Sequence, residues 1–400
     1  MKKIFHNLKL LAYNRLYVPV RVRMVRKKKT ISVAFLIWEL ASWKTELLYL
    51  SMLAHPRFYP RLIVVKCPNS YDSYKMVISY LESKGYDYLF VNETQKIRDY
   101  FKPDIIFYQK PYQSEVFDRQ KLRYNFSSLF CYVPYSCLNY IAEWSICQPI
   151  SLYAWQHYLL NDFTKEEMSR ALPSKKNSLV VTGLPFNDKY ISYSCNNDPW
   201  KSRDPKIKRI IWAPHHTIPH TESSRSNYIN FSTFLTYSDF MLEVADSYNG
   251  SVEFAFKPHP LLRYRLEKKW GKEKTDTYYA KWSDGDNTQL IEGDYVDLIM
   301  HSDAMIHDCA SFILEYYFSG KPSLFLLNGQ DTTGMVQFEK EGFDLLYKAE
   351  TREQIIRFVD DIIAGKDPKL TAREEFKNRY LIPKGDSASE NIINAILGDN

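Results

Sequence analysis

The sequence predicts an α/β protein with two parallel-sheet domains, and three observations lead to this prediction. The chain has 400 residues, well above the ~150 of a typical single domain. Its composition, 45% apolar and 25% charged, is that of an ordinary globular protein with real cores. Short apolar runs alternate with helical patterns, and this alternation is interrupted near the middle and then resumes. We therefore expect two α/β domains whose strand ends face a cleft.

The first half shows the alternation clearly. Apolar runs rich in β-branched and aromatic residues predict strands at 31–37, 61–66, 88–91, 104–108 and 129–133. Helical spacing predicts helices at 42–54, 73–84, 93–101 and 113–121. Because the connections are short, these elements predict a parallel sheet covered by helices on both faces.

A polar, proline-containing stretch from Gly183 to Pro205 interrupts this pattern and predicts a linker. Beyond it we expect strands at 209–213, 252–256, 304–306 and 323–326, with helices at 233–248, 295–301 and 311–318 and closing helices at 351–364 and 386–397. The expected organisation is an arm at 1–29, domains at 30–195 and 205–375, and a C-terminal helical segment at 376–400.

Several common classes of protein are excluded. The longest apolar run, 31–38, is too short for the ~18–20 residues of a membrane-spanning helix. The six cysteines include no C-x-x-C pair, which argues against a disulfide scaffold and favours a reducing, cytoplasmic setting. No G-x-G and no P-loop occur, so a nucleotide would need another kind of binding site.

The positive charge belongs to the N-terminal arm. Residues 1–29 contain ten Lys and Arg and no acid, so their charge is +10. The whole chain has a net charge of +6, so the rest of the chain carries 6 − 10 = −4. Apolar residues alternate with these cations, which suits a segment lying on an anionic membrane surface. A solvated, partly disordered terminus and a nucleic-acid-binding arm are the alternatives, but the body offers no basic face, and we expect no nucleic-acid partner. Charges interrupt every candidate core of a signal peptide.

The first candidate site follows the predicted strand 252–256. Lys257 and His259 stand beside two prolines, which fix the backbone at the strand's carboxyl end. An ammonium group and an imidazole in this position can neutralise a phosphate and donate hydrogen bonds to its oxygens. The alternative is a rigid corner with an exposed Lys and a packed His.

The second candidate follows the predicted strand 304–306. Asp308 stands at its end, and Ser311 lies near the start of the next predicted helix, where free backbone amides favour phosphate. Glu315 lies one turn later on the same face and could accept hydrogen bonds from ribose hydroxyls. The alternative is that Asp308 and Ser311 only cap the helix.

The third candidate is the histidine group His215, His216 and His220. The spacing invites a metal site, but neighbouring prolines prevent a regular helix and no nearby ligand completes a set before Glu222. We expect a contact to the ligand's phosphate through His215, or a plain loop, and no metal. The D-x-D at Asp284 to Asp286 lies in a polar turn, which favours a solvated turn over a metal site.

With these residues assembled, the chain resembles the CDP-glycerol glycerophosphotransferase family, makers of teichoic-acid-like and capsular phosphoglycerol polymers. The resemblance rests on Lys257 to Pro260, on Asp308 to Ser311 with Ala310 in place of a serine, on Glu315, on Lys321-Pro322, on Trp212 to Pro214, and on Thr182 to Asp188 with Phe186 in place of an arginine. It implies a fold similar to GT-B glycosyltransferases, with two Rossmann-like domains. It covers residues 180–330 well and earlier residues weakly.

The resemblance also implies roles for individual residues. His259 would be catalytic, and the donor would contact Lys257, Asp308, Ser311, Glu315, His215 and Gly183. The family's histidine–glycine pair on the acceptor side is missing at Tyr132 to Ser136. Glu39, just after the first predicted strand, is our substitute for the base, and His157 is a second choice.

We therefore expect a transferase that moves phosphoglycerol, or a similar phospho-alcohol, from a CDP-activated donor to a lipid-linked polymer and releases CMP. It would need no cofactor or metal, and the arm would hold it on the inner face of the cell membrane. Two alternatives stay open: a GT-B glycosyltransferase using a nucleotide sugar, and a non-catalytic protein that assembles other enzymes at the membrane.

Overall fold

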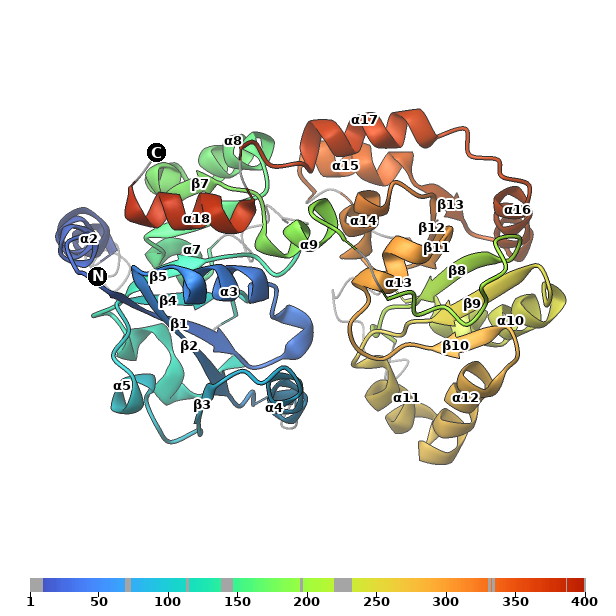
Figure 1. The fold of residues 1–400 in the computed structure, drawn as a ribbon, viewed down its shortest axis with the longest axis horizontal. Coiled ribbons are helices and arrows are strands. Elements are labelled where there is room, and N and C mark those ends of the chain that lie inside the picture. The colour runs from blue at the N-terminus through green and yellow to red at the C-terminus, as the bar shows by residue number, and fades with distance from the viewer. Residues whose placement is uncertain are drawn as a thin grey trace. The chain divides into compact units, whose positions relative to one another are not determined.

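The computed structural model describes residues 10–68, 73–112, 115–137, 147–194, 197–218, 232–329, 332, 335–385 and 387–398. The chain divides into two compact units, residues 1–189 with 381–400 and residues 190–380. Each unit is a parallel sheet flanked by helices, so the predicted α/β fold class is confirmed (Figure 1). In the described part of the chain, no helix is both long and apolar enough to span a membrane.

The sheet of the first unit has strand order β3-β2-β1-β4-β5-β6-β7. Its strands are Ile31–Ile37 (β1), Phe58–Val65 (β2), Tyr88–Val91 (β3), Ile105–Tyr108 (β4), Leu129–Tyr132 (β5), Gln156–Leu159 (β6) and Leu179–Val181 (β7). β1 pairs with β2 and β4 on either side, and nearly all of its side chains are buried. A strand covered on both faces explains why this segment is a continuous apolar run.

Helices cover this sheet on both faces. They are Glu46–Ala54 (α3), Ser73–Ser83 (α4), Ile97–Tyr100 (α5), Pro149–Tyr153 (α7), Asp162–Ala171 (α8) and Ala388–Leu397 (α18), with Asp188–Ile191 (α9) at the boundary between the units. The C-terminal helix α18 lies beside α3 (Figure 1). Asp188 fixes its start, since the carboxylate accepts hydrogen bonds from the backbone N–H groups of Ala388 and Ser389 at 2.9 and 3.0 Å.

The second unit repeats the architecture with strand order β10-β9-β8-β11-β12-β13. Its strands are Lys208–Ala213 (β8), Val252–Phe256 (β9), Thr288–Leu290 (β10), Ala304–His307 (β11), Ser323–Leu326 (β12) and Tyr347–Ala349 (β13). Its helices are Phe234–Ser247 (α10), Leu262–Trp270 (α11), Lys272–Asp284 (α12), Val296–His301 (α13), Phe312–Glu315 (α14), Gln337–Leu345 (α15), Arg352–Ile363 (α16) and Leu370–Tyr380 (α17). Trp212, Phe256 and Trp282 pack ring against ring in the centre of its core.

The second half of the predicted linker packs against the second unit. Trp200 is 1% exposed, and its indole N–H donates to the Leu298 carbonyl. The backbone N–H groups of Lys201 and Ser202 both donate to the buried carboxylate of Glu253 at 2.8 Å. Residues 195 and 196 of the linker lie outside the described residues.

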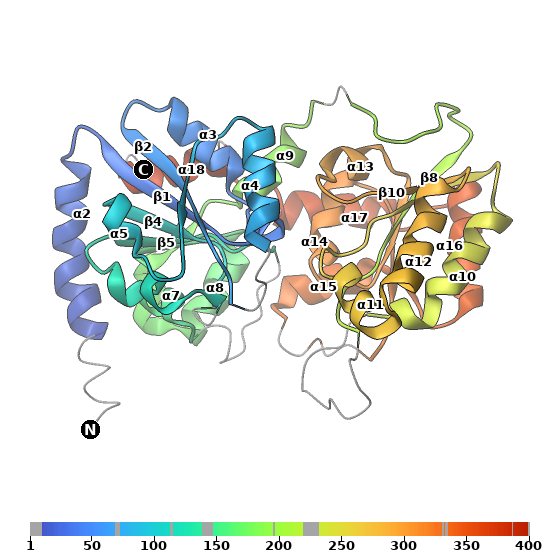
Figure 2. The same ribbon diagram turned by 90° about the horizontal axis from the view of Figure 1, so that it is seen from below.

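The N-terminal arm contains a helix, Val18–Arg26 (α2), that packs against the first unit (Figure 2). Val18 and Val25 are buried, and the Arg21 guanidinium donates to Asp104 at 2.8 Å. Arg26 donates to the last carbonyls of α18 at 2.8 and 3.0 Å. The alternative of a solvated, partly disordered terminus therefore does not hold for α2, while residues 1–9 lie outside the described residues.

Candidate functional site

Three neighbouring strands of the second sheet carry the predicted donor residues at their carboxyl ends. His215 follows β8, Lys257 and His259 follow β9, and Asp308 follows β11. These three strands are neighbours in the sheet, in the order β9-β8-β11. The loops after β8 and β9 are joined directly, since the His259 backbone N–H donates to the Pro214 carbonyl at 3.1 Å. This edge is where ligands bind in open parallel sheets.

The imidazoles of His215, His216 and His259 form a cluster at this edge. Their ring centroids lie 4.3, 5.0 and 4.2 Å apart, and one ring nitrogen from each lies within 4.8 Å of the others. All three residues are half-buried. His220, the third histidine of the predicted group, lies outside the described residues, and sequence reasoning missed the pairing of His216 with His259.

Hydrogen bonds determine what these rings can bind. The Leu261 backbone N–H donates to His259 Nδ1 at 3.1 Å. His215 Nδ1 lies 3.0 Å from the Thr217 hydroxyl and 3.4 Å from the Thr217 backbone N–H. A neutral imidazole that accepts at Nδ1 carries its proton at Nε2. The His259 ring therefore presents an Nε2–H donor, which suits a phosphate oxygen. Burial and the neighbouring His216 lower the pKa of His215 to about 3, so this ring is neutral near pH 7.

Lys257 adds a positive charge beside the cluster. The residue is 7% exposed, and its ammonium group lies 4.3 Å from the ring centroid of Tyr295 and 5.6 Å from that of Phe312. The Tyr295 hydroxyl donates to Glu315 Oε1 at 2.7 Å, and the Tyr190 hydroxyl donates to the same oxygen at 2.9 Å. Glu315 is thus held by two tyrosines that sequence reasoning did not find.

Asp308 is bonded to the chain's own backbone, and its predicted contact with the donor stays a prediction. It is fully buried, and its carboxylate accepts hydrogen bonds from the backbone N–H groups of His215 and Thr233 and from the Thr233 hydroxyl, at 2.5 to 2.8 Å. Burial raises the pKa of Asp308 to about 6, although these hydrogen bonds lower it. Asp308 therefore positions the loop that carries His215.

The predicted helix at 311–318 is shorter than expected. Its α-helical part is only Phe312–Glu315, and a 3₁₀ turn continues it over Tyr316–Ser319. The Ser311 hydroxyl lies 3.0 Å from Cys309 Sγ and makes no capping bond. A four-residue helix has little macrodipole, so the backbone-amide part of the predicted phosphate site is weaker than the sequence suggested.

Gly183 is explained by packing in the first unit. Its φ is +77°, and a Cβ atom there would lie 2.9 Å from Pro383 Cβ and 3.1 Å from Ala388 Cβ. The chain needs glycine at this turn because the C-terminal segment approaches so closely. The predicted contact of Gly183 with the donor stays a prediction without support from this geometry.

The acceptor-side candidate Glu39 belongs to an ion-pair network in the first unit. Glu39 follows β1, Lys110 follows the adjacent β4, and the Lys110 ammonium lies 2.6 Å from Glu39 Oε2 and 2.7 Å from Glu115 Oε2. His157, the second choice for the base, is 3% exposed in β6, and burial lowers its pKa to about 3. A ring so deeply buried is unsuited to deprotonating a substrate.

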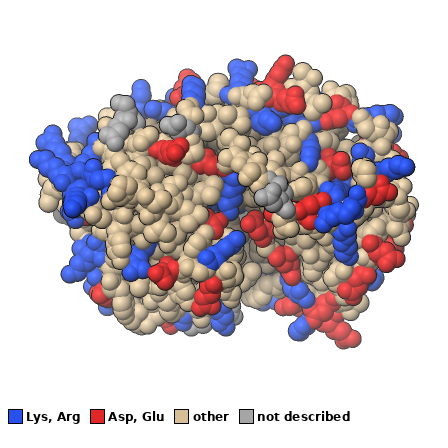
Figure 3. Space-filling view, viewed as in Figure 1, with Lys and Arg blue, Asp and Glu red and all other residues tan. Residues whose placement is uncertain are grey.

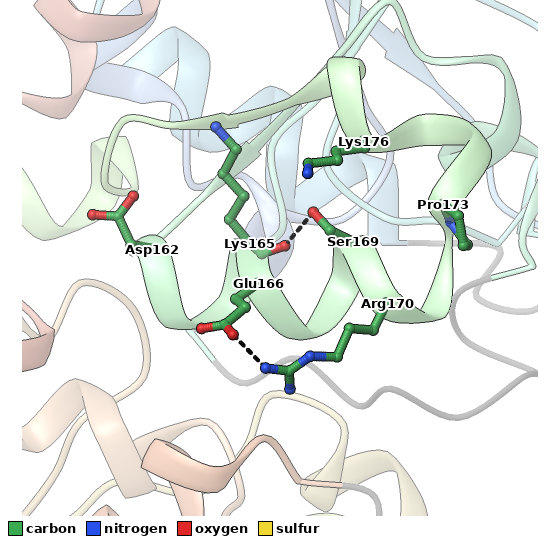
Figure 4. A pocket seen from close by; sticks show the side chains of 7 residues that line it. All are labelled: Asp162, Lys165, Glu166, Ser169, Arg170, Pro173 and Lys176. Carbon is green, nitrogen blue, oxygen red and sulfur yellow. Dashed lines mark hydrogen bonds and ion pairs between the residues drawn. The ribbon is translucent and has the colours of Figure 1, made fainter.

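A shallow groove of about 580 Å³ lies along α8 in the first unit (Figure 4). It is lined by Asp162, Lys165, Glu166, Ser169, Arg170, Pro173 and Lys176. Glu166 and Arg170 pair with each other across one turn, and Ser169 donates to the Lys165 carbonyl at 2.6 Å. The groove contains none of the predicted site residues. The D-x-D at 284–286 lies at the end of α12 and in the turn before β10, as predicted.

The two parallel-sheet units place the chain among GT-B-like α/β proteins. Solved structures agree, and at these identities they show the fold alone. A putative UDP-N-acetylglucosamine 2-epimerase from Listeria monocytogenes is similar with a TM-score of 0.60 and 14% identity, over 93% of this chain and 97% of that one. A variant of the wall teichoic acid polymerase TagF is similar with a TM-score of 0.59 and 12% identity, over 100% and 97%. No curated protein matches the chain.

The family follows from the sequence match. The model of the family described as CDP-Glycerol:Poly(glycerophosphate) glycerophosphotransferase matches residues 152–398, more than half of the chain. The chain therefore belongs to this family and is a transferase of cell-surface polymer synthesis, which confirms the predicted resemblance. The match includes all the predicted donor residues and excludes Glu39.

Proposed function

We propose that the chain transfers a phosphoglycerol, or a similar phospho-alcohol, from a CDP-activated donor to a lipid-linked cell-surface polymer and releases CMP. The observation that carries this proposal is the cluster of His215, His216 and His259 beside Lys257 at the carboxyl edge of the second sheet. These groups lie within the region that matches the family model. Together they offer a cation and neutral N–H donors, which is the chemistry that a diphosphate requires.

The reaction that we propose is a displacement at the donor's β-phosphorus. An acceptor hydroxyl loses its proton to a base, and its oxygen forms a new bond to phosphorus. The bond between this phosphorus and the oxygen that bridges to the α-phosphate breaks, and CMP leaves with the electron pair. Lys257 and His259 would stabilise the charge on the phosphate oxygens, which is the main source of catalysis in phosphoryl transfer.

We further propose that α2 brings the enzyme to the inner face of the membrane. Leu16, Val20 and Met24 are spaced four residues apart along the helical arm and are 70%, 56% and 54% exposed. Exposed Arg15 and Arg23 stand among them, and Lys and Arg gather over this end of the first unit (Figure 3). Apolar side chains surrounded by cations suit the headgroup region of an anionic bilayer.

The first test measures the melting temperature of the purified protein with millimolar CDP and, separately, with UDP. A ligand at 100 times its Kd stabilises the folded state by about 2.7 kcal/mol. We expect a shift with CDP, followed by release of CMP from CDP-glycerol when an acceptor is supplied. A shift with UDP alone would contradict the proposal and favour a nucleotide sugar as donor. CDP binding without turnover would favour the non-catalytic assembly protein.

A matched pair of variants tests the site. Lys257→Met removes the cation, and Lys281→Met removes an exposed cation from α12 in the same unit. The CDP-induced shift should fall strongly in Lys257→Met and stay unchanged in Lys281→Met. Equal shifts in both variants would remove Lys257 from the donor site.

A further inference from the structure

We propose that Glu39, Lys110 and Glu115 together form the acceptor-side base of the transfer, with Glu39 as the proton acceptor and Lys110 as its positioning residue. This inference rests on the proposed function and assigns Lys110 and Glu115, which the sequence did not single out. All three belong to the first unit, and they lie outside the region of the family match.

The first argument is position. Glu39 and Lys110 follow adjacent strands β1 and β4 at their carboxyl ends, where parallel sheets bind ligands. The three side chains are 13% to 20% exposed, so the network is desolvated but still reachable. The Trp38 indole N–H donates to Glu115 Oε2 at 3.0 Å, and the Tyr135 ring lies 5.9 Å from the Lys110 ammonium. These contacts hold the network in one arrangement.

The second argument is charge. One ammonium group stands between two carboxylates, so the network carries a net charge of −1 when all three groups are ionised. Burial lowers the pKa of Lys110, but the two carboxylates raise it above its usual value, so Lys110 keeps its charge. The network can therefore take up one proton and become neutral, which is what a general base must do.

The third argument is an open oxygen. Glu39 Oε2 accepts the bond from Lys110, while Glu39 Oε1 accepts no hydrogen bond from the described residues. The comparable buried pair in this unit differs. Glu46 Oε2 pairs with Lys189 at 2.6 Å, and Glu46 Oε1 accepts from two tyrosine hydroxyls. Glu46 and Lys189 form a closed, neutral pair, whereas Glu39 keeps an acceptor for a hydroxyl group.

Other titratable groups near this edge of the sheet do not balance the extra negative charge of the network. Tyr135 is buried, its pKa is raised by burial and by the nearby Tyr112, and it stays neutral. Lys66, after β2, pairs with Glu93 at 3.0 Å. Lys44 lies with its ammonium 3.6 Å from the ring centroid of Phe186. The excess negative charge therefore stays on the two carboxylates.

The experiment measures CMP release from CDP-glycerol with membranes as the source of acceptor, as a function of pH. Glu39→Gln should lower kcat about 100-fold or more while leaving the CDP-induced melting shift intact. Lys110→Met leaves two carboxylates facing each other, which favours protonation, so the acidic limb of the profile should move to higher pH. Glu115→Gln leaves Glu39 alone with the cation, so the same limb should move to lower pH.

Controls separate this role from a structural one. Lys110→Arg should restore the position of the acidic limb, and Glu46→Gln, in the closed pair, should leave it unmoved. The inference would be overturned if the kcat of Glu39→Gln stayed within threefold of wild type. It would also be overturned if the acidic limbs of Lys110→Met and Glu115→Gln did not move in opposite directions. Either result would leave the proposed function standing. A wild-type protein that neither responds to CDP nor releases CMP would overturn both.

Discussion

The two units share an architecture but differ in the chemistry at the carboxyl edges of their sheets. In the first unit this edge carries Glu39 and Lys110 in an ion-pair network with excess negative charge. In the second unit it carries Lys257 and three imidazoles, with the Asp308 carboxylate buried against backbone N–H groups. By our proposals, the same strand-end geometry would provide a proton acceptor in one unit and an anion site in the other. The fold supplies the positions, and a few residues after the strands decide the function.

The largest effect that we expect comes from His259→Ala. If this imidazole stabilises the transferring phosphate, its loss should lower kcat by about 10²–10³-fold, the usual cost of removing one preorganised donor. Steady-state CMP release measures this change. His55→Ala, which removes a histidine from the first unit, is the matched control and should leave kcat unchanged. Near-wild-type turnover in His259→Ala would mean that the second unit's edge binds the donor without His259.

The next effect is on stability and concerns Asp308→Ala. The variant leaves the backbone N–H groups of His215 and Thr233 without their acceptor, which should cost about 2–3 kcal/mol of unfolding free energy. Urea unfolding at pH 7 measures it. Asp308→Asn keeps one acceptor oxygen and should lose less. Equal losses in both variants would show that the carboxylate does not hold these two loops together.

In both units the sequence predicts the long apolar strands and misses short ones. The strands at 31–37, 88–91, 252–256 and 323–326 were predicted with correct bounds, because buried parallel strands are continuous apolar runs. The short strands β6, β10 and β13 were missed, since three or four residues with polar members give no such signal. The strand β7 is apolar but has only three residues, which is too short for a clear pattern. Among sites, Lys257 and His259 stand next to prolines in one motif and were found.

The remaining site residues could not be found from spacing alone. Lys110 and Glu115 are 71 and 76 residues from Glu39, and only the pairing of β1 with β4 brings these segments together. A partial signal existed, because Lys110 comes two residues after a predicted strand. Asp308 was found as a motif residue, but its burial against Thr233, 75 residues away, depends on tertiary packing.

A smaller effect concerns the exposed cations of the helical arm in the first unit, Arg15 just before α2 and Arg23 within it. Each cation near an anionic bilayer contributes about 1 kcal/mol, so Arg15→Gln with Arg23→Gln should weaken binding to phosphatidylglycerol vesicles by about 2 kcal/mol, or about 30-fold. Lys102→Gln with Arg119→Gln removes two exposed cations elsewhere in this unit and is the control. Co-sedimentation with anionic and with neutral vesicles measures the change. Equal binding by both double variants would mean that α2 does not contact the membrane.

The smallest effect concerns acid stability, and it compares buried imidazoles in the two units. Burial lowers the pKa of His157 in the first unit and of His307 in the second to about 3, below the ordinary 6.5. Their contribution to stability is complete above pH 6.5 and is lost as the pH falls, because the unfolded chain then binds protons that the folded chain excludes. The slope is at most about 1.4 kcal/mol per pH unit for each ring.

Asp308 acts in the opposite direction in the second unit. Its folded pKa of about 6 lies above the ordinary 3.8, so between pH 6 and 4 the folded chain binds the extra proton and acid stabilises it. We therefore expect His157→Leu and His307→Leu each to flatten the loss of unfolding free energy between pH 6.5 and 5, and Asp308→Asn to steepen it. Urea unfolding at several pH values measures these slopes. Parallel slopes for wild type and all three variants would mean that carboxylates elsewhere, and not these buried groups, control the acid stability of both units.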